Sequence, residues 1–557
     1  MPSVTPAWQT VAAREKASLD AKLASFPVPK VAPTTPNVQQ IDLAGTLSAR
    51  EIEITEVEVE GLVERLQKGE YKAEEVTRAF IARAAVAHSL TNCLTGVFFE
   101  KAIERAKFLD AEFARTGKPT GPLHGLPVSL KNQCNVEGEE MNLCYVGWVG
   151  RVAKENAVVV DCLLAQGAVI YCHTNMPQAL FSGETVCNLH GRTVNPFNRE
   201  LAAGGSSGGE GALIAMRGSV LGVGSDIGGS VRIPSAFNGL YGFRPSYNRI
   251  PYGGASNSQE GQETVPSVLG PMSSSLSGLK LFFKAVLDAQ PWKADPLALH
   301  MPFSESAYSL AEHGGEGGQL CFGLLEDNGI VRPDAPYARA MKEMKEALEA
   351  KGHKVIDYTP PEAAKGAELL VSIFLADGGA DVNHECAISG EPNLGGVLAG
   401  AQPKHLSTYE FWQLSYARRR YIAEQLKAWE STKDLTGTGR PIDAIISPPA
   451  PYVSFKHGEK QDIYYTGQCN INDWPTTVLP VTTVDAQKDV KQPLPEGETF
   501  HSEFDKLNYE RYDPAVFGGM PVALQIIGRK GEDEAVLRMT EIADAALKQH
   551  KAASSSV

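Results

Sequence analysis

The chain has 557 residues, 43% hydrophobic and 21% charged, so it is long enough for one very large domain or for two to three smaller ones. Its net charge of −14 argues against a protein that binds nucleic acid or an anionic membrane through charge. No uninterrupted run of about 18 apolar residues predicts a transmembrane helix, and the stretch from Met1 to about Lys30 lacks the apolar segment of a secretory signal.

The nine cysteines are scattered and include no Cys-x-x-Cys pair, and the 12 histidines include no His-x-x-x-His pair. This pattern predicts reduced thiols in a cytoplasmic protein, with neither a disulfide framework nor a bound metal. Nothing in the sequence indicates an organic cofactor.

The N-terminal half begins with a Pro-rich segment, residues 27–36, that predicts an extended arm. Apolar residues at helical spacing predict amphipathic helices over Ala73–Leu90 and Lys101–Arg115. A strand, a helix and a strand are then predicted at Leu126–Lys131, Ala157–Ala165 and Ala168–Cys172.

The same order of elements returns in the C-terminal half, with a strand, a helix and a strand predicted at Leu320–Leu325, Tyr337–Ala350 and Lys354–Tyr358. Further buried strands are predicted at Asp443–Ser447 and Pro521–Ile527, before a closing helix at Glu532–Leu547. This alternation predicts an α/β sheet with helices on its faces.

Three polar, Gly-rich or Pro-rich intervals, 252–267, 310–319 and 484–500, are predicted to be surface loops or insertions. No composition break divides the chain sharply. We therefore expect one large α/β unit over residues 51–557, preceded by an arm and helical extension over residues 1–50.

A dense run of glycine and serine occupies residues 204–230, with ten glycines and five serines. Such density marks backbone that approaches a neighbour closely or adopts positive φ. A linker is disfavoured because the apolar runs Ala212–Met216 and Val220–Val223 interrupt the segment. A phosphate-binding loop is also disfavoured, because the P-loop motif is absent and the Gly222–Gly228 spacing is one residue too long for the dinucleotide fingerprint.

Another alternative is a nucleophile elbow, since residues 205–209 satisfy the Gly-x-Ser-x-Gly pattern with Ser207 at its centre. That chemistry would need an acid and then a histidine downstream. His457, His501 and His550 are available, but no sequence context distinguishes any of them. The elbow also leaves Lys131 and the run from Asp226 to Ser230 unexplained.

Lys131 offers a base for the serines if it is buried, because burial disfavours the ammonium form and lowers the lysine pKa. A serine between the base and a nucleophilic serine can relay a proton, since its hydroxyl both donates and accepts. The glycines after Asp226 leave the backbone N–H groups of residues 227–230 free to converge as an oxyanion hole. Together these parts indicate acyl transfer through a covalent acyl-enzyme.

These residues resemble the amidase signature family. The resemblance extends from about residue 50 to 548, and its motifs are Lys131, Gly204–Gly209, Gly224–Arg232, Gly121–Pro127, Gly191–Pro196, Gly270–Met272 and Gly519–Gly528. Within the family, Glu210, Tyr241–Pro245 and Gly261–Thr264 are most similar to the fungal acetamidase and general amidase branch. The resemblance implies an α/β/α fold in which helices flank a large mixed sheet.

The resemblance also implies roles for individual residues. Ser230 would be the nucleophile, Ser206 the bridging serine with a cis peptide bond, and Lys131 the base. The oxyanion hole would be formed by Ile227, Gly228, Gly229 and Ser230. Asp226 and Arg232 would either brace the loop or form an ordinary ion pair, and Ser207 would either hydrogen-bond the lysine or cap the following helix.

Two points remain open within the resemblance. Asn132 stands where many relatives carry Asp, which is compatible with a neutral lysine but leaves the surrounding network undefined. Met176, Cys187 and Trp474 are candidates for the substrate pocket, although large apolar residues of this kind more often belong to the core.

The implied activity is hydrolysis of a small carboxamide to a carboxylate and ammonia, without metal or cofactor. A carbamate or ester hydrolase would use the same triad, and an amidotransferase subunit or a non-enzymatic binding protein are further alternatives. The expected partner is a small amide or carbamate substrate rather than nucleic acid or a membrane, and the sequence leaves open whether the chain forms a homodimer.

Overall fold

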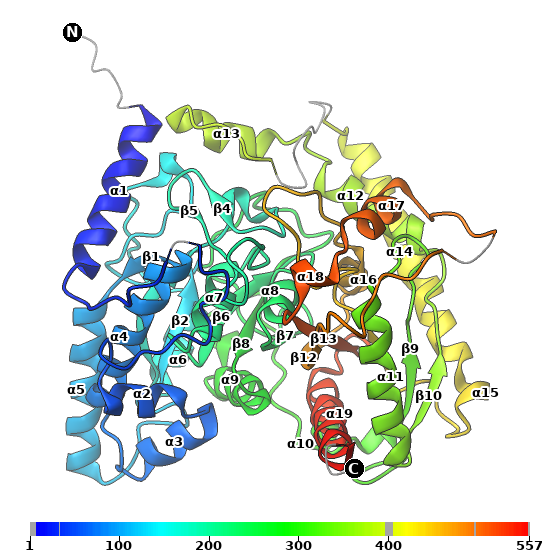
Figure 1. Cartoon of the computed structure of the whole chain (residues 1–557), viewed down its shortest axis with the longest axis horizontal. Coiled ribbons are helices and arrows are strands. Elements are labelled where there is room, and N and C mark those ends of the chain that lie inside the picture. The colour runs from blue at the N-terminus through cyan, green and yellow to red at the C-terminus, as the bar shows by residue number, and fades with distance from the viewer. Residues whose placement is uncertain (1–6, 33, 396–404, 495–496, 555–557) are drawn as a thin grey trace.

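The computed structural model describes residues 7–32, 34–395, 405–494 and 497–554. A mixed sheet of eleven strands runs through it (Figure 1). The strand order is β1 (Leu94–Val97), β3 (Val169–Thr174), β2 (Pro127–Lys131), β6 (Leu221–Asp226), β8 (Val268–Ser273), β7 (Tyr241–Arg244), β12 (Thr476–Thr483), β13 (Pro521–Ile527), β11 (Ala444–Ser447), β9 (Cys321–Leu324) and β10 (Lys354–Asp357). The short strands β4 (Val186–Cys187) and β5 (Gly191–Arg192) form a separate antiparallel pair.

Helices cover the sheet. In the N-terminal half they are α1 (Trp8–Leu23), α2 (Ala49–Glu56), α3 (Val59–Gln67), α4 (Ala73–Thr91), α5 (Phe99–Thr116), α6 (Val158–Ala165), α7 (Gly208–Ala215), α8 (Arg232–Phe237) and α9 (Leu276–Asp288). In the C-terminal half they are α10 (Glu305–Tyr308), α11 (Ala335–Ala350), α12 (Ala363–Phe374), α13 (Ala380–Ser389), α14 (Thr408–Ser431), α15 (Lys433–Thr436), α16 (Tyr464–Asn472), α17 (Glu503–Arg511), α18 (Pro514–Phe517) and α19 (Asp533–Ser554). Figure 1 shows α1–α5 gathered at the β1 end of the sheet and α11, α14 and α15 at the β10 end.

Local sequence explains several helix boundaries. Ser48 and Glu51 form a capping box that starts α2, because each satisfies a backbone N–H of the other. Helix α4 ends where Asn92 adopts a left-handed conformation with φ of 55°, and α5 ends at Gly117 in the same region with φ of 67°. The helices predicted at Ala73–Leu90 and Lys101–Arg115 are confirmed by α4 and α5.

The pairing of β2 with its neighbours positions the candidate site. β2 runs parallel to both β3 and β6, so the carboxyl ends of the three strands lie at the same edge of the sheet. Lys131 ends β2 and Asp226 ends β6. The topology therefore brings together two motifs that lie about 95 positions apart in the sequence.

The predicted fold class is confirmed, since a large mixed sheet is flanked by helices. The closing helix continues beyond the predicted Leu547 to Ser554. The division into residues 1–50 and 51–557 stays a prediction, and α2 crosses that boundary. Among the helices of the described ranges, none combines the length and the apolar character that a bilayer crossing needs.

The intervals 252–267, 310–319 and 484–500, predicted to be surface loops or insertions, are not exposed throughout, because each contains buried residues. His313 is buried against Asp443, and Asp489 is buried against Arg339 on α11. Each of these buried polar side chains has a hydrogen-bonding partner far away in the sequence, and composition alone does not reveal such a partner.

Candidate active site

Lys131, Ser206 and Ser225 meet at the carboxyl edge of β2 and β6. Lys131 Nζ lies 2.6 Å from Ser206 Oγ and 2.9 Å from Ser225 Oγ. Ser206 precedes α7, and the Gly205–Ser206 peptide bond is cis. The structure thus places the predicted base and the predicted bridging serine in direct hydrogen-bond contact.

The Lys131 side chain is completely buried. Burial lowers the pKa of the Lys131 ammonium to about 7, although the negative charge of Asp226 opposes the shift. A substantial fraction of the lysine is therefore neutral near pH 7 and able to accept a proton.

Ser225 and Gln133 fix how the amine is oriented. Ser225 Oγ donates its single proton to Gln133 Oε1 at 2.6 Å, so towards Lys131 it acts as an acceptor. A neutral amine that donates to Ser225 still has its lone pair for Ser206. This arrangement allows the Ser206 hydroxyl to donate to Lys131, which is the direction that a proton relay needs.

Ser230 lies at the mouth of this cluster, in the loop between β6 and α8. Its exposed fraction is 8%, whereas that of Ser206 is 1%. The backbone N–H of Ser207 donates to the Ser230 carbonyl at 3.2 Å, which ties the two serine segments together. Ser230 and Gly205 line the same cavity, so a ligand there would reach Ser230 without displacing Ser206.

The predicted oxyanion hole is only partly available. Gly229 N–H donates to Asp226 Oδ1 at 2.8 Å, so the expectation of four free amides is wrong at Gly229. The N–H groups of Ile227, Gly228 and Ser230 have no such intramolecular acceptor within the described residues. Thr466 Oγ1 donates to the Gly228 carbonyl at 2.6 Å and holds the plane of the following peptide.

Asp226 and Arg232 form a fully buried bidentate ion pair, with Nε to Oδ2 at 3.0 Å and Nη2 to Oδ1 at 2.9 Å. Burial alone would raise the pKa of Asp226, but the charge and hydrogen bonds of Arg232 outweigh it and hold the pKa well below its usual range. Asp226 also accepts from Gly229 N–H and Val231 N–H. The pair is therefore placed to brace the loop that contains Ser230.

Neither predicted contact of Ser207 is present among the described residues. Ser207 Oγ accepts from Ser225 N–H at 3.3 Å, and it makes no hydrogen bond that caps α7 and none to Lys131. Asn132 faces away from the lysine network: its amide nitrogen donates to Thr95 Oγ1 at 2.9 Å and to Asn142 Oδ1 at 3.0 Å.

The nucleophile elbow lacks a partner histidine. His457 contacts Glu184 and the Arg199 carbonyl, and His501 contacts Asp327. His550 lies 3.8 Å from Glu346. Because each is engaged elsewhere and Ser207 is completely buried, the elbow interpretation finds no support in the part of the chain that the structure describes.

A narrow apolar cavity opens beside Ser230. The volume of this cavity is about 30 Å³. None of its lining residues is charged; they are Leu180, Phe181, Ser182, Gly183, Gly205, Ile227, Gly228, Ser230, Ile233, Phe374 and Ile463.

The three residues proposed for the pocket do not line this cavity. Met176 and Cys187 are buried in the apolar cluster behind it, and Trp474 packs against Trp429 with ring centroids 5.4 Å apart. They are core residues, as large apolar residues usually are. Phe181 and Phe374, whose ring centroids lie 5.4 Å apart, occupy the wall instead.

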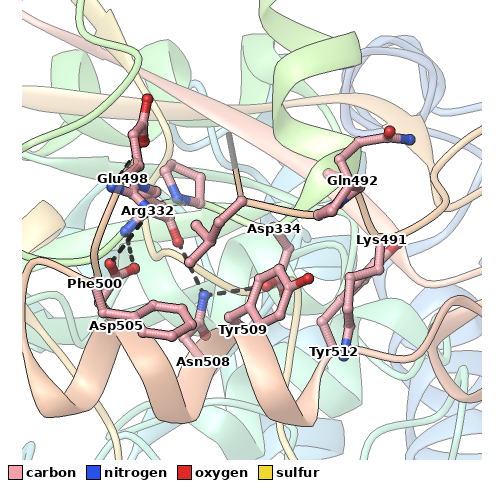
Figure 2. A pocket seen from close by; sticks show the side chains of 14 residues that line it. Arg332, Asp334, Lys491, Gln492, Glu498, Phe500, Asp505, Asn508, Tyr509 and Tyr512 are labelled. Atoms are coloured by element: carbon pink, nitrogen blue, oxygen red, sulfur yellow. Dashed lines mark hydrogen bonds and ion pairs between the residues drawn. The ribbon is translucent and has the colours of Figure 1, made fainter. Parts of the chain in front are cut away.

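A larger cavity of about 300 Å³ lies elsewhere, between α17 and the segment that precedes α11 (Figure 2). Within it, Arg332 Nη2 pairs with Glu498 Oε2 at 3.1 Å and Asn508 Nδ2 donates to Asp334 Oδ1 at 3.1 Å. None of the predicted site residues lines it. Its size alone does not make it the reaction site.

Sequence reasoning missed Ser225, Gln133, Thr466 and Asn470. Asn470 Nδ2 donates to Asp226 Oδ1 at 2.9 Å, and Arg232 Nη2 donates to Asn470 Oδ1 at 2.6 Å. Thr466 and Asn470 belong to α16, more than 230 positions after the loop that they support. Ser225 was within the recognised motif, and its adjacency to Asp226 was the one available signal.

Comparisons with known proteins show which family the chain resembles. The model of the Amidase family matches residues 75–537. An acetamidase of Aspergillus oryzae is 40% identical over 97% of this chain and 98% of its own, and an acetamidase of Emericella nidulans is 41% identical over 89% of this chain and 90% of its own. The solved structure of a fatty acid amide hydrolase superimposes with a TM-score of 0.87 at 30% identity, covering 98% of this chain and 97% of that one.

Proposed function

Since the chain belongs to the amidase family and is a hydrolase of amide C–N bonds, we propose that it cleaves short, uncharged carboxamides to a carboxylate and ammonia with Ser230, Ser206 and Lys131 as its catalytic residues. The observation that most supports this assignment is the 2.6 Å contact between Lys131 Nζ and Ser206 Oγ in a fully buried setting. A lysine with its pKa lowered to about 7 is a competent base.

In the proposed reaction Ser230 Oγ attacks the carboxamide carbon. Its proton passes to Ser206 Oγ while the proton of Ser206 passes to Lys131 Nζ. The N–H groups of Ile227, Gly228 and Ser230 would stabilise the tetrahedral oxyanion. The proton then returns by the same route to the leaving nitrogen, ammonia departs, and water hydrolyses the acyl-enzyme with Lys131 again as base.

The cavity supports a small acyl group as the preferred substrate. Its small volume suits a short acyl chain, and its uncharged walls would leave an ionised acyl group unpaired. The acetamidases among the relatives support the same class.

Ammonia and alcohol release from a graded series of amides, carbamates and esters by the purified chain tests the proposal. Ser230→Ala should reduce turnover to background, and Lys131→Ala should reduce kcat by about 10²–10⁴-fold, the usual contribution of a general base. Lys68→Ala, which removes an exposed lysine at the C-cap of α3, is the control and should retain full activity.

A fluorophosphonate probe provides a second readout, because it labels an activated serine whatever the substrate. Labelling of Ser230 that disappears in Lys131→Ala supports the triad. Full turnover by Ser230→Ala, or labelling at Ser207 instead, would refute it. Alcohol release that exceeds ammonia release would redirect the proposal to carbamates or esters.

A further inference from the structure

Glu210, in the first turn of α7, has a completely buried carboxyl that the proposed reaction does not use. Ser129 Oγ donates to Glu210 Oε2 at 2.6 Å, and Thr174 Oγ1 donates to Glu210 Oε1 at 2.8 Å. Both carboxyl oxygens therefore accept a hydrogen bond from a hydroxyl, a pattern that stabilises the ionised form.

The two hydroxyls place this carboxyl beside Lys131. Ser129 lies two residues before Lys131 on β2, and alternate residues of a strand point to the same face. Thr174 of β3 is the direct strand partner of Lys131. The Glu210 carboxyl is thus held between Ser129 and Thr174, which are both neighbours of Lys131 in the sheet.

The sheet is also shaped to admit the carboxyl. Gly222 of β6 pairs with Ser129, and a Cβ at Gly222 would collide with Glu210 Oε2. The absence of a side chain there creates the space that Glu210 occupies. Gly222 therefore provides the space for the Glu210 carboxyl, and Ser129 and Thr174 provide its two hydrogen-bond donors.

Lys131 is the one cation found near Glu210 within the described residues. The other titratable groups that face Glu210 or Lys131 from β2, β3, β6 and the adjoining loops are Cys93, Cys134, Cys144, Tyr171, Cys172 and Asp226. Burial raises the pKa of each of these thiols and of the Tyr171 phenol, so they are neutral near pH 7. Asp226 is ionised and its charge also favours the Lys131 ammonium, but its carboxylate is paired with Arg232.

We propose that Glu210 is a positioning residue for the reaction proposed above, on which this inference rests: its carboxylate provides the counter-charge that stabilises the Lys131 ammonium formed when the nucleophile loses its proton. Burial raises the pKa of the Glu210 carboxyl to about 7, and the hydrogen bonds from Ser129 and Thr174 and the charge of Lys131 oppose that shift. Glu210 does not line the substrate cavity.

Glu210→Gln keeps the shape and removes the charge. Without the carboxylate, Lys131 binds its proton less tightly, so the acid limb of kcat/KM should move to lower pH by about one unit, the low end of the effect of a nearby opposite charge. A weaker base should also lower the plateau kcat by up to about tenfold, while KM stays within about twofold.

Asp334→Asn is the matched control, because it makes the same acid-to-amide change at a buried carboxyl in the cavity of Figure 2. It should leave the acid limb in place. Glu210→Asp retains the charge and should bring the limb back towards the parent position. Thr174→Val, which removes one donor to the carboxylate, should move the limb in the same direction as Glu210→Gln but less far.

An acid limb that stays in place in both Glu210→Gln and Thr174→Val would overturn this inference and leave the proposed function intact. Turnover by Ser230→Ala, in contrast, would overturn the proposed function itself. If Glu210→Gln does not fold, as judged by circular dichroism, Thr174→Val alone decides the question.

Discussion

At the scale of single residues, the protonation of Lys131 sets the pH dependence of the proposed activity. The lysine must be neutral to accept a proton, so kcat/KM should rise with pH through a limb near 7, the value to which burial lowers its pKa. Lys131→Arg keeps a cation that cannot lose its proton, and should be inactive at every pH. Initial rates from about pH 5 to 9 measure the limb, and a limb near 10 would contradict a buried neutral amine.

The same burial affects stability. The unfolded chain binds a proton at Lys131 up to a pKa near 10.5, whereas the folded chain releases it near 7. Between these values the unfolded state holds more protons, so this group makes the folded state more stable as pH rises and less stable as pH falls towards 7. The base is therefore maintained at a cost in stability that is greatest below pH 7.

The sequence predicts which residues of the motifs belong to the candidate site, but it does not predict the hydrogen bonds that they form. Lys131, Ser206 and Ser230 stand in recognisable patterns. The engagement of Gly229 N–H by Asp226 and the contact of Ser225 with Lys131 depend on side-chain directions that spacing does not determine. The pocket residues were missed for a similar reason, because Met176 and Phe181 are equally apolar in the sequence.

At the scale of elements, the close packing of α7 on β3 should be sensitive to a single methyl group. A Cβ at Gly209 would collide with the backbone N and O of Asn175 and lie 2.8 Å from the Cys93 carbonyl oxygen. Backbone cannot move aside as a flexible side chain can. Gly209→Ala should therefore lower the free energy of unfolding by about 1–3 kcal/mol and reduce activity, since α7 follows Ser206 directly.

Gly96→Ala on β1 is the control for this helix contact, because a Cβ there would lie 3.6 Å from His173 Cβ, an ordinary packing distance. Its effect should stay within about 1 kcal/mol. Urea denaturation followed by circular dichroism measures both variants. Equal stability of the two would show that α7 adjusts its position more easily than the contact suggests.

Helix α16 marks the limit of prediction for elements. Its residues Thr466 and Asn470 support the loop that contains Ser230, but the segment matches no motif. Strongly patterned elements such as β13 were predicted with the observed bounds. Supporting elements are defined by what they contact, and those contacts appear only once the sheet is assembled.

At the scale of the whole molecule, a buried cluster joins the closing helix to the centre. Arg249 pairs with Asp533 at 3.1 Å and with Glu534 at 2.6 Å, and all three side chains are fully buried. Arg249→Met would leave two buried carboxylates without their cation. It should lower the free energy of unfolding by about 3–5 kcal/mol, as measured by denaturant titration.

Lys284→Met removes a cation that pairs with Asp288 at the surface, and is the control for this cluster. Its effect should stay below about 1 kcal/mol, because water screens an exposed pair. A similar small loss for Arg249→Met would mean that water reaches the buried cluster.

The order of the strands could not be derived from the sequence. Neighbours such as β7 and β12 are separated by more than 230 positions, and hydrophobic patterning says which segments are strands but not which of them pair. The fold class followed from the alternation of elements, and the assignment to a mixed sheet followed from the resemblance.

The uncharged wall of the cavity beside Ser230 has a consequence for how substrate and product travel. In the proposed reaction the substrate is a neutral amide, which the field of a chain with net charge −14 does not draw in, so its arrival rate should not depend on ionic strength. The carboxylate that leaves is repelled by that same field. The net negative charge of the chain thus acts on the carboxylate product and not on the neutral substrate, and it disfavours rebinding of the product.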